Sequence, residues 1–231
     1  MYPAPALATQ EKPATAGRPR AFVPADALQS ALGVFWQRGF EATSLDDLTD
    51  AMQLSRSSFY ACFGSKHAVF MAAIQCYSDE RFAAIQEVAR SMPDPIAAVQ
   101  AVLTTIADTG GGPRGCFFAN SVTELAPHDP ALATYCQSHI KRVLKVVTGL
   151  LITAGFKPQL AETRAGAALA LAMGAITLRK AGIPAAPIRA LLDQAPTLLA
   201  LPRHTAATNR RGHLPSGLKP NQARPPVSTS T

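Results

Sequence analysis

The sequence predicts an all-helical protein in which a three-helix helix-turn-helix unit precedes a larger helical domain. Hydrophobic residues make up 48% of the 231 residues, enough to bury a sizeable core. They are rich in alanine and leucine and poor in alternating Val, Ile and Thr, which favours helices over sheets. Glycine and proline clusters then divide the chain into segments with helical periodicity.

The first helix is predicted from Pro24 to Gly39. Proline suits the first turn of a helix, and glycine at the other end suits a C-cap. Apolar pairs recur every four residues on one face: Ala27/Leu28, Ala31/Leu32 and Phe35/Trp36. This spacing predicts an amphipathic helix whose apolar face is buried.

A short second helix is predicted to start at Thr43 or Ser44, because Ser44 and Asp47 have the spacing of a capping box. Its buried face consists of four apolar residues: Leu45, Leu48, Ala51 and Met52. A turn at Gln53 and Leu54 ends it after about two turns of helix.

Ser55 is predicted to cap a third helix that ends at Phe63, with Phe59 and Phe63 four residues apart on its inner side. Its outer face then carries Arg56, Ser57, Tyr60 and Ala61. Arginine can donate two hydrogen bonds to a guanine edge, serine adapts to several bases, and tyrosine can bind a phosphate. The third helix therefore has the chemistry of a helix that enters the major groove of DNA.

The runs 43–48 and 54–66, with the Tyr-x-x-Phe-x-x-Lys ending at Tyr60, Phe63 and Lys66, resemble the N-terminal domain of the tetracycline-repressor (TetR) family. The resemblance covers roughly residues 20–70. It implies that Arg56 and Ser57 face base edges and that Lys66 binds a phosphate at the start of a fourth helix. It also implies phosphate contacts from four further residues: Thr43, Ser44, Ser55 and Tyr60. Taken singly they are not diagnostic, because Thr43 and Ser44 are expected as helix caps in any protein and surface residues such as Arg56 and Lys66 are usually only solvated charges.

The net charge of +7 does not itself predict DNA binding. Five basic residues and no acid lie in 203–231, whereas residues 21–64 carry five acids against Arg38 and Arg56. Ahead of the first helix, Arg18 and Arg20 resemble a flexible arm that reaches the DNA backbone or the minor groove, and a solubilising tail is an equal alternative. Local placement of charge must therefore support any DNA-binding hypothesis.

The domains are predicted as a disordered basic arm (1–20), the helix-turn-helix domain (21–66), an effector-binding and dimerisation domain (67–202) and a disordered basic tail (203–231). Further helices are expected near 66–90, 94–108, 116–126, 129–154, 158–181 and 185–200. The helix after Pro158 is rich in small residues: Ala165, Gly166, Ala167, Ala168, Ala170, Ala172, Gly174 and Ala175. With the last helix, which carries Ile188, Leu191, Leu192, Leu198 and Leu199, it resembles the family's dimerisation pair. The alternative is that both helices fill the core of one chain.

The segment from Arg114 to Asn120 resembles the Gly-Cys-aromatic start of the sixth helix in one subgroup of the family. An effector pocket is expected beside it, lined by Phe82, Ile106, Cys116, Phe117, Phe118, Asn120 and Leu125, although such apolar stripes are also typical of ordinary core. Cys116, at a helix start, is either a reactive sensor or a buried structural thiol. A metal shared by Cys136 and His139 with His128 or Cys116 lacks a full ligand set, so neither a metal nor a cofactor is expected.

Enzyme motifs are missing or out of context. The run Gly110–Gly115 satisfies G-x-G-x-x-G, but no strand precedes it, and Walker, nucleophile-elbow and zinc-protease motifs are lacking. With no signal peptide and no membrane span expected, a cytoplasmic location is predicted. The prediction is a homodimeric, non-enzymatic transcriptional repressor, released from a palindromic DNA operator by a small-molecule effector. The alternative is a helical ligand-binding or scaffold protein that has lost DNA binding.

Overall fold

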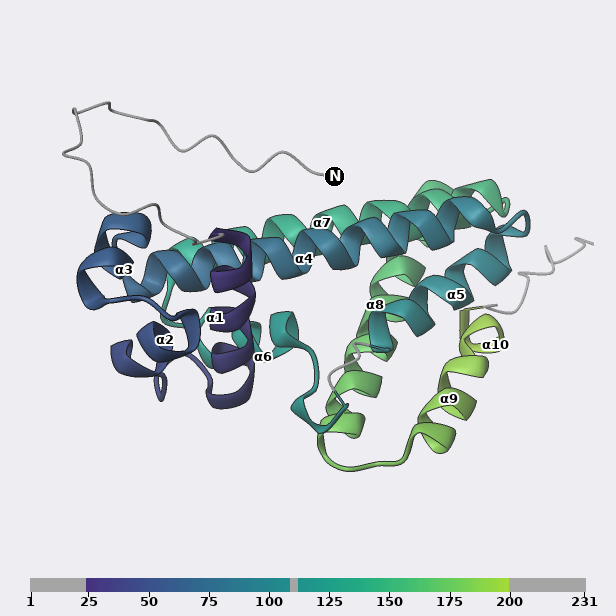
Figure 1. Ribbon diagram of the computed structural model, residues 1–231. Helices are drawn as coiled ribbons and strands as arrows, with labels where there is room; N and C mark the ends of the chain where they lie inside the picture. The colour runs from purple at the N-terminus through teal and green to yellow at the C-terminus, as the bar shows by residue number, and fades with distance from the viewer. Residues whose placement is uncertain (1–23, 109–111, 200–231) are drawn as a thin grey trace, which may run out of the picture. The chain divides into compact units, whose positions relative to one another are not determined.

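Three short helices form the N-terminal part of the computed structural model, which describes residues 24–108 and 112–199 (Figure 1). They are α1 (Pro24–Arg38), α2 (Leu45–Met52) and α3 (Arg56–Phe63). Ser44 and Asp47 close the predicted capping box at the start of α2, and the Ser55 hydroxyl accepts a hydrogen bond from the Ser58 amide at the start of α3. The predicted helix-turn-helix unit is confirmed.

Five further helices of 8 to 26 residues follow. They are α4 (Lys66–Ser91), α5 (Pro95–Ala107), α6 (Phe117–Glu124), α7 (Pro130–Thr153) and α8 (Pro158–Lys180). Three begin with proline, and the Asp94 and Asp129 side chains cap α5 and α7 by accepting backbone N–H bonds. Each agrees with its predicted range to within two residues.

The prediction of one last helix over 185–200 is wrong. The structure has two helices, α9 (Ala185–Asp193) and α10 (Ala195–Leu199), separated at Gln194. Pro196 explains the break, because a proline has no N–H for the helical ladder and its ring clashes with the carbonyl four residues earlier. A single 3₁₀ turn, η1 (Gly112–Arg114), was also not predicted.

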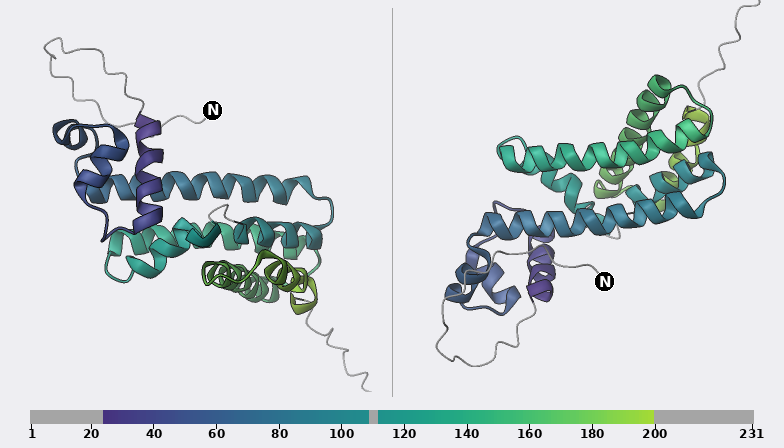
Figure 2. Two further views of the ribbon diagram at one scale, coloured as in Figure 1. Left: turned by 60° about the horizontal axis from the view of Figure 1, so that its bottom comes forward. Right: turned by 90° about the horizontal axis from the view of Figure 1, so that it is seen from above.

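Helices α4 and α7 pack against each other, and α1 crosses α4 near its N-terminal half (Figures 1 and 2). Helix α6 contacts both α4 and α7, while α5 packs on α4, α7 and α8. Helix α9 packs against α8 and α5. Helix α4 therefore links the N-terminal helices to the rest of the described chain.

One apolar cluster runs through the helix-turn-helix unit and on into α4, α6 and α7. Its large buried side chains include Phe35, Phe59, Phe70 and Phe117. The Phe70 ring lies 5.1 Å from Phe35 and 5.7 Å from Phe117, both edge-on, which is a favourable arrangement for aromatic pairs. The apolar core is thus continuous across the boundary predicted between residues 66 and 67, and residues 24–108 and 112–199 belong to one compact unit.

Small residues lie on two faces of α8. Ala165, Ala168, Ala172 and Ala175 are fully buried against neighbouring helices, as the core alternative predicted. Gly166, Ala167, Ala170 and Gly174 are exposed on the other face. Of the last-helix residues, Ile188 and Leu192 are buried and Leu198 is exposed. Dimerisation through the exposed face remains a prediction.

The predicted basic arm and tail lie outside the described residues. Within residues 24–108 and 112–199, no helix has the length and apolar character that a membrane span needs.

Candidate nucleic-acid interface and internal cavity

The outer face of α3 has the orientation that the sequence predicted. Arg56, Ser57, Tyr60 and Ala61 are exposed, whereas Phe59 is fully buried in the core cluster. The Phe59 ring lies 5.9 Å from the ring of Phe63, which is half-buried. The buried Phe59 ring therefore fixes which side of α3 meets solvent.

Arg56 is paired with Asp46 of α2. Its Nε atom lies 3.1 Å from Asp46 Oδ1, and its Nη2 atom lies 2.6 Å from Oδ1 and 2.8 Å from Oδ2. Hydrogen bonding to the carboxylate raises the pKa of Arg56 above its ordinary value. This pair was not predicted from the sequence, because residues ten positions apart meet only once α2 and α3 pack.

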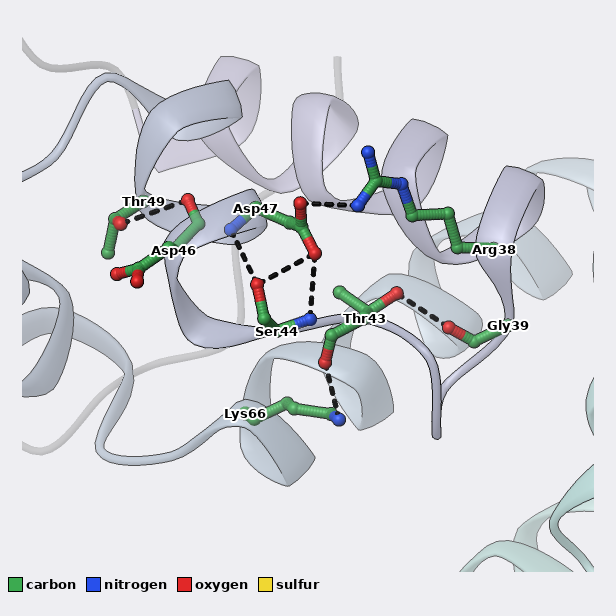
Figure 3. A network of polar contacts seen from close by, with 8 residues as sticks. All are labelled: Arg38, Gly39, Thr43, Ser44, Asp46, Asp47, Thr49 and Lys66. Atoms are coloured by element: carbon green, nitrogen blue, oxygen red, sulfur yellow. Dashed lines mark hydrogen bonds and ion pairs between the residues drawn. The ribbon is translucent and has the colours of Figure 1, made fainter.

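The N-terminus of α2 is a small polar network (Figure 3). The Ser44 hydroxyl accepts from the Asp47 amide at 3.0 Å and donates to Asp47 Oδ2 at 2.7 Å, while Arg38 forms an ion pair with Asp47. The Ser44 hydroxyl and the Ser44 amide, which both donate to Asp47 Oδ2, lower the pKa of Asp47, and Arg38 lowers it further. Ser44 is exposed but already serves as a cap, so a phosphate would have to share its hydroxyl.

Thr43 and Lys66 point toward protein rather than solvent. Thr43 is 1% exposed and its hydroxyl donates to the Gly39 carbonyl at 2.6 Å, which argues against the predicted phosphate contact of this side chain. Lys66 Nζ donates to the Thr43 carbonyl at 2.6 Å (Figure 3). The same Nζ atom lies 4.4 Å from the centre of the Phe40 ring. Lys66 therefore braces the loop before α2, and a phosphate contact would use its remaining N–H groups.

Of the other residues predicted to bind DNA, two are exposed next to Arg56 and one lies outside the described residues. Ser55 and Tyr60 are exposed beside Arg56, and the Ser55 hydroxyl lies 3.0 Å from that of Ser57. Arg20 lies outside the described residues. The roles of all these side chains toward DNA stay predictions.

Glu124, at the end of α6, holds the loop between α1 and α2. Its Oε1 atom accepts hydrogen bonds from the Phe40 amide at 2.8 Å and the Glu41 amide at 3.3 Å. Gly39 allows this approach, because its φ is +83° and a Cβ there would lie 2.7 Å from the carboxylate. This contact was not predicted from the sequence, because it joins residues more than 80 positions apart.

Glu124→Ala is expected to lower the free energy of unfolding by about 1 kcal/mol, because an exposed charged acceptor for two amides is lost. Amide hydrogen exchange at Phe40 and Glu41 should speed up. Glu162→Ala on α8 removes an exposed carboxylate elsewhere and should change stability by less than about 0.5 kcal/mol. Unchanged exchange at Phe40 in the Glu124 variant would contradict the tether.

A cavity of about 90 Å³ lies among α4, α5, α6, α7 and α8. Three predicted pocket residues line it: Ile106, Cys116 and Phe118. Polar lining residues that the sequence analysis missed are Tyr77, Ser78, Arg81 and His139. These residues lie on the long helices α4 and α7. Helical periodicity indicates which face of such a helix is buried, but not which buried residue lines the cavity.

The other four predicted pocket residues do not line the cavity. Phe117 packs its ring on Trp36 and Tyr77, and Leu125 is buried in the core cluster. Phe82 lies under the Arg142 guanidinium, 4.2 Å from it. Asn120 donates to the Arg114 carbonyl and accepts from Lys180. Adjacent positions on one helix point in different directions, so these four side chains pack elsewhere, and their role toward an effector stays a prediction.

The cavity is mostly apolar with a few polar groups. The Tyr77 hydroxyl lies 3.4 Å from Cys116 Sγ, and burial raises the pKa of Tyr77. Arg81 donates to the carbonyls of Thr105 and Asp108. Cys116 is buried, as the structural-thiol alternative requires. Among the described residues, no group of three His, Cys, Asp or Glu side chains could hold a metal.

His139 is buried against the rings of Phe118 and Phe82. Burial first, then Arg142, lowers its pKa to about 4, against a smaller opposite effect of Asp79. A histidine whose pKa is lower in the folded than in the unfolded state adds to the free energy of unfolding. This contribution is fully present above the unfolded pKa of about 6.5 and is lost as the pH falls toward 4.

Between pH 7.5 and pH 5, the wild-type protein is expected to lose about 2 kcal/mol of unfolding free energy that His139→Leu does not lose. Urea unfolding of both proteins at the two pH values measures the difference. Parallel losses in the two proteins would show that His139 does not remain neutral in the fold.

Two family models match the chain. Residues 27–73 match "Bacterial regulatory proteins, tetR family", and residues 95–194 match "Transcriptional regulator LmrA/YxaF-like, C-terminal domain". The first range holds α1–α3 and the start of α4, and the second holds α5–α9. The two matches thus cover both the candidate interface and most of the cavity.

Among curated proteins, the chain is 35% identical over 127 residues to the HTH-type transcriptional repressor ComR of Escherichia coli, covering 53% of this chain and 60% of ComR. It is 31% identical over 130 residues to the uncharacterized HTH-type transcriptional regulator YezE of Bacillus subtilis, covering 55% of this chain and 67% of YezE. The match to ComR therefore spans less than two thirds of that relative's length.

Among solved structures, the chain resembles a cysteine mutant of the TetR family transcriptional regulator CifR complexed with 26-base-pair double-strand operator DNA. The TM-score is 0.69 at 26% identity, over 78% of this chain and 98% of the other. The TetR-family regulator SCO4454 of Streptomyces coelicolor has a TM-score of 0.68 at 24% identity, over 76% and 93% of the two chains, and supports the fold alone.

Proposed function

The chain belongs to the TetR family of bacterial regulatory proteins, and we propose that it is a homodimeric transcriptional repressor that binds a palindromic DNA operator and leaves it when a small effector binds. The observation that carries the proposal is the outer face of α3. Arg56, Ser57 and Tyr60 are exposed there on a helix anchored by the buried Phe59. Such a face offers donors for base edges and for phosphates.

The relatives support the direction of this proposal. ComR is a transcriptional repressor, and CifR has been solved with operator DNA. Two recognition helices in a dimer can read successive major grooves when they lie about 34–36 Å apart. The exposed small residues Gly166, Ala167, Ala170 and Gly174 on α8 would allow close approach of a second chain.

The cavity supports regulation by a small, mostly apolar molecule with a hydrogen-bonding group. Cys116 and Phe118, at the start of α6, line the cavity, while Glu124 at its end binds the loop before α2. In the proposed mechanism, an effector that prefers a shifted α6 also shifts the helix-turn-helix unit and changes the separation of the two recognition helices. The proposed repressor has no enzymatic activity, and it acts in the cytoplasm, where operator DNA lies.

One observation favours the alternative of a ligand-binding or scaffold protein without DNA binding. The acid Asp46 neutralises Arg56, and Lys66 bonds inward to the Thr43 carbonyl. In that case the protein would prefer no DNA sequence, and the salt concentration would not change its affinity for DNA.

Selection of bound fragments from random duplex DNA tests the proposal. We expect enrichment of one motif with two inverted half-sites whose centres lie about one helical turn, or a multiple of it, apart. Failure to enrich any motif, with and without extracts of small metabolites, would support the alternative.

A further inference from the structure

We infer that Asp46 is a positioning residue that determines sequence specificity by holding Arg56, an inference that rests on the proposed DNA-binding function. Asp46 lies in the first turn of α2 and Arg56 is the first residue of α3. The contact therefore spans the turn between α2 and α3 and connects α2 directly to the outer face of α3.

The pair is not explained by stability. The side chains are 65% and 63% exposed, and exposed ion pairs contribute little to folding because water screens them. A carboxylate on a surface that faces DNA also repels phosphates. Asp46 therefore lowers the attraction of this surface for DNA in general, so its contribution has to lie in how Arg56 binds.

The geometry shows what the carboxylate does to the guanidinium. Asp46 binds the edge formed by Nε and Nη2, through three contacts of 2.6–3.1 Å. Among the described residues, no hydrogen bond is made by Nη1, so the end formed by Nη1 and Nη2 stays available for the O6 and N7 acceptors of a guanine. These fixed contacts also remove rotamer freedom that the long Arg56 side chain would otherwise lose on binding DNA.

Without Asp46, Arg56 is free to turn toward the nearest phosphate. A phosphate contact adds affinity for every sequence and carries no base information. Asp46 thus lowers the affinity for DNA of any sequence and increases the discrimination between sequences, because it keeps the guanidinium directed to a base edge and away from the backbone.

The test uses the full chain and three duplexes: the site enriched by the wild-type protein, that site with one base pair changed in each half, and a scrambled duplex of the same length. Asp46→Asn is expected to weaken binding to the enriched site by about three-fold and to strengthen binding to the scrambled duplex by about three-fold, which lowers the specificity ratio by about ten-fold. For the scrambled duplex, the plot of log K against log salt concentration should steepen by about 0.9 for each phosphate gained.

Asp50→Asn is the matched control, because it removes the same charge from an exposed position on the same helix without touching Arg56. It should strengthen binding to all three duplexes alike and leave the ratio unchanged. In an Arg56→Ala background, Asp46→Asn should no longer change the ratio. Thermal unfolding of each variant reports on folding separately.

Two outcomes separate the failures. If the wild-type protein prefers one site and Asp46→Asn changes the ratio no more than Asp50→Asn, or changes it equally with and without Arg56, the positioning role is overturned and the proposed function stands. If the wild-type protein prefers no sequence, the proposed function falls and this inference falls with it.

Discussion

Phe59→Ala is expected to lower the free energy of unfolding by about 3–5 kcal/mol. The ring is fully buried and is the anchor of α3 within the apolar cluster that joins the helix-turn-helix unit to α4 and α6. Its removal leaves a cavity that an eight-residue helix cannot fill by itself. Urea unfolding followed by circular dichroism measures the change.

Phe63→Ala is the matched control for this substitution. It removes the same ring from the same helix, but Phe63 is half-buried, so the expected loss is about half as large. Equal losses for the two variants would show that α3 is not anchored through Phe59. The predicted orientation of its outer face toward DNA would then lose its physical basis.

Arg56→Ala is expected to weaken binding to the enriched DNA site by about 1–3 kcal/mol, or roughly 5- to 150-fold, and to relax the base preference at one position of each half-site. The reason is the loss of two N–H donors directed to a base edge from the start of α3. Binding to the wild-type site and to all single-base variants of it measures both effects.

Lys66→Ala is the comparison that separates base recognition by Arg56 from phosphate binding by Lys66. If Lys66 contacts a phosphate, all sequences should weaken similarly, and the loss of its bond to the Thr43 carbonyl should also lower thermal stability. Equal weakening of every sequence by both Arg56→Ala and Lys66→Ala would contradict the base-reading role of Arg56.

The sequence was sufficient to predict the helices because their end signals are local. Ser44 with Asp47, Ser55, Asp94 and Pro130 are caps or first-turn residues whose effect depends on neighbours within four positions. The same logic explains the error at 185–200. Pro196 is a local signal as well, but the leucines on both sides of it continued the helical periodicity.

Contacts between helices were beyond sequence reasoning. The pairs Arg56 with Asp46, Lys66 with the Thr43 carbonyl, and Glu124 with the Phe40 amide depend on how the helices pack. Each changes the interpretation of a residue that the sequence had placed on the DNA-binding surface or had left out. The cavity is a similar case, since periodicity finds buried faces and voids follow from the fit of side chains across five helices.

Affinity for the enriched duplex at 50 and 200 mM salt tests the central claim of operator binding most directly. With two to four phosphates neutralised per dimer, the affinity should fall by about 10- to 150-fold over this range, and two chains should bind each duplex. Affinity that stays constant across the two salt concentrations, or is equal for the enriched and scrambled duplexes, would contradict the claim that this protein reads an operator.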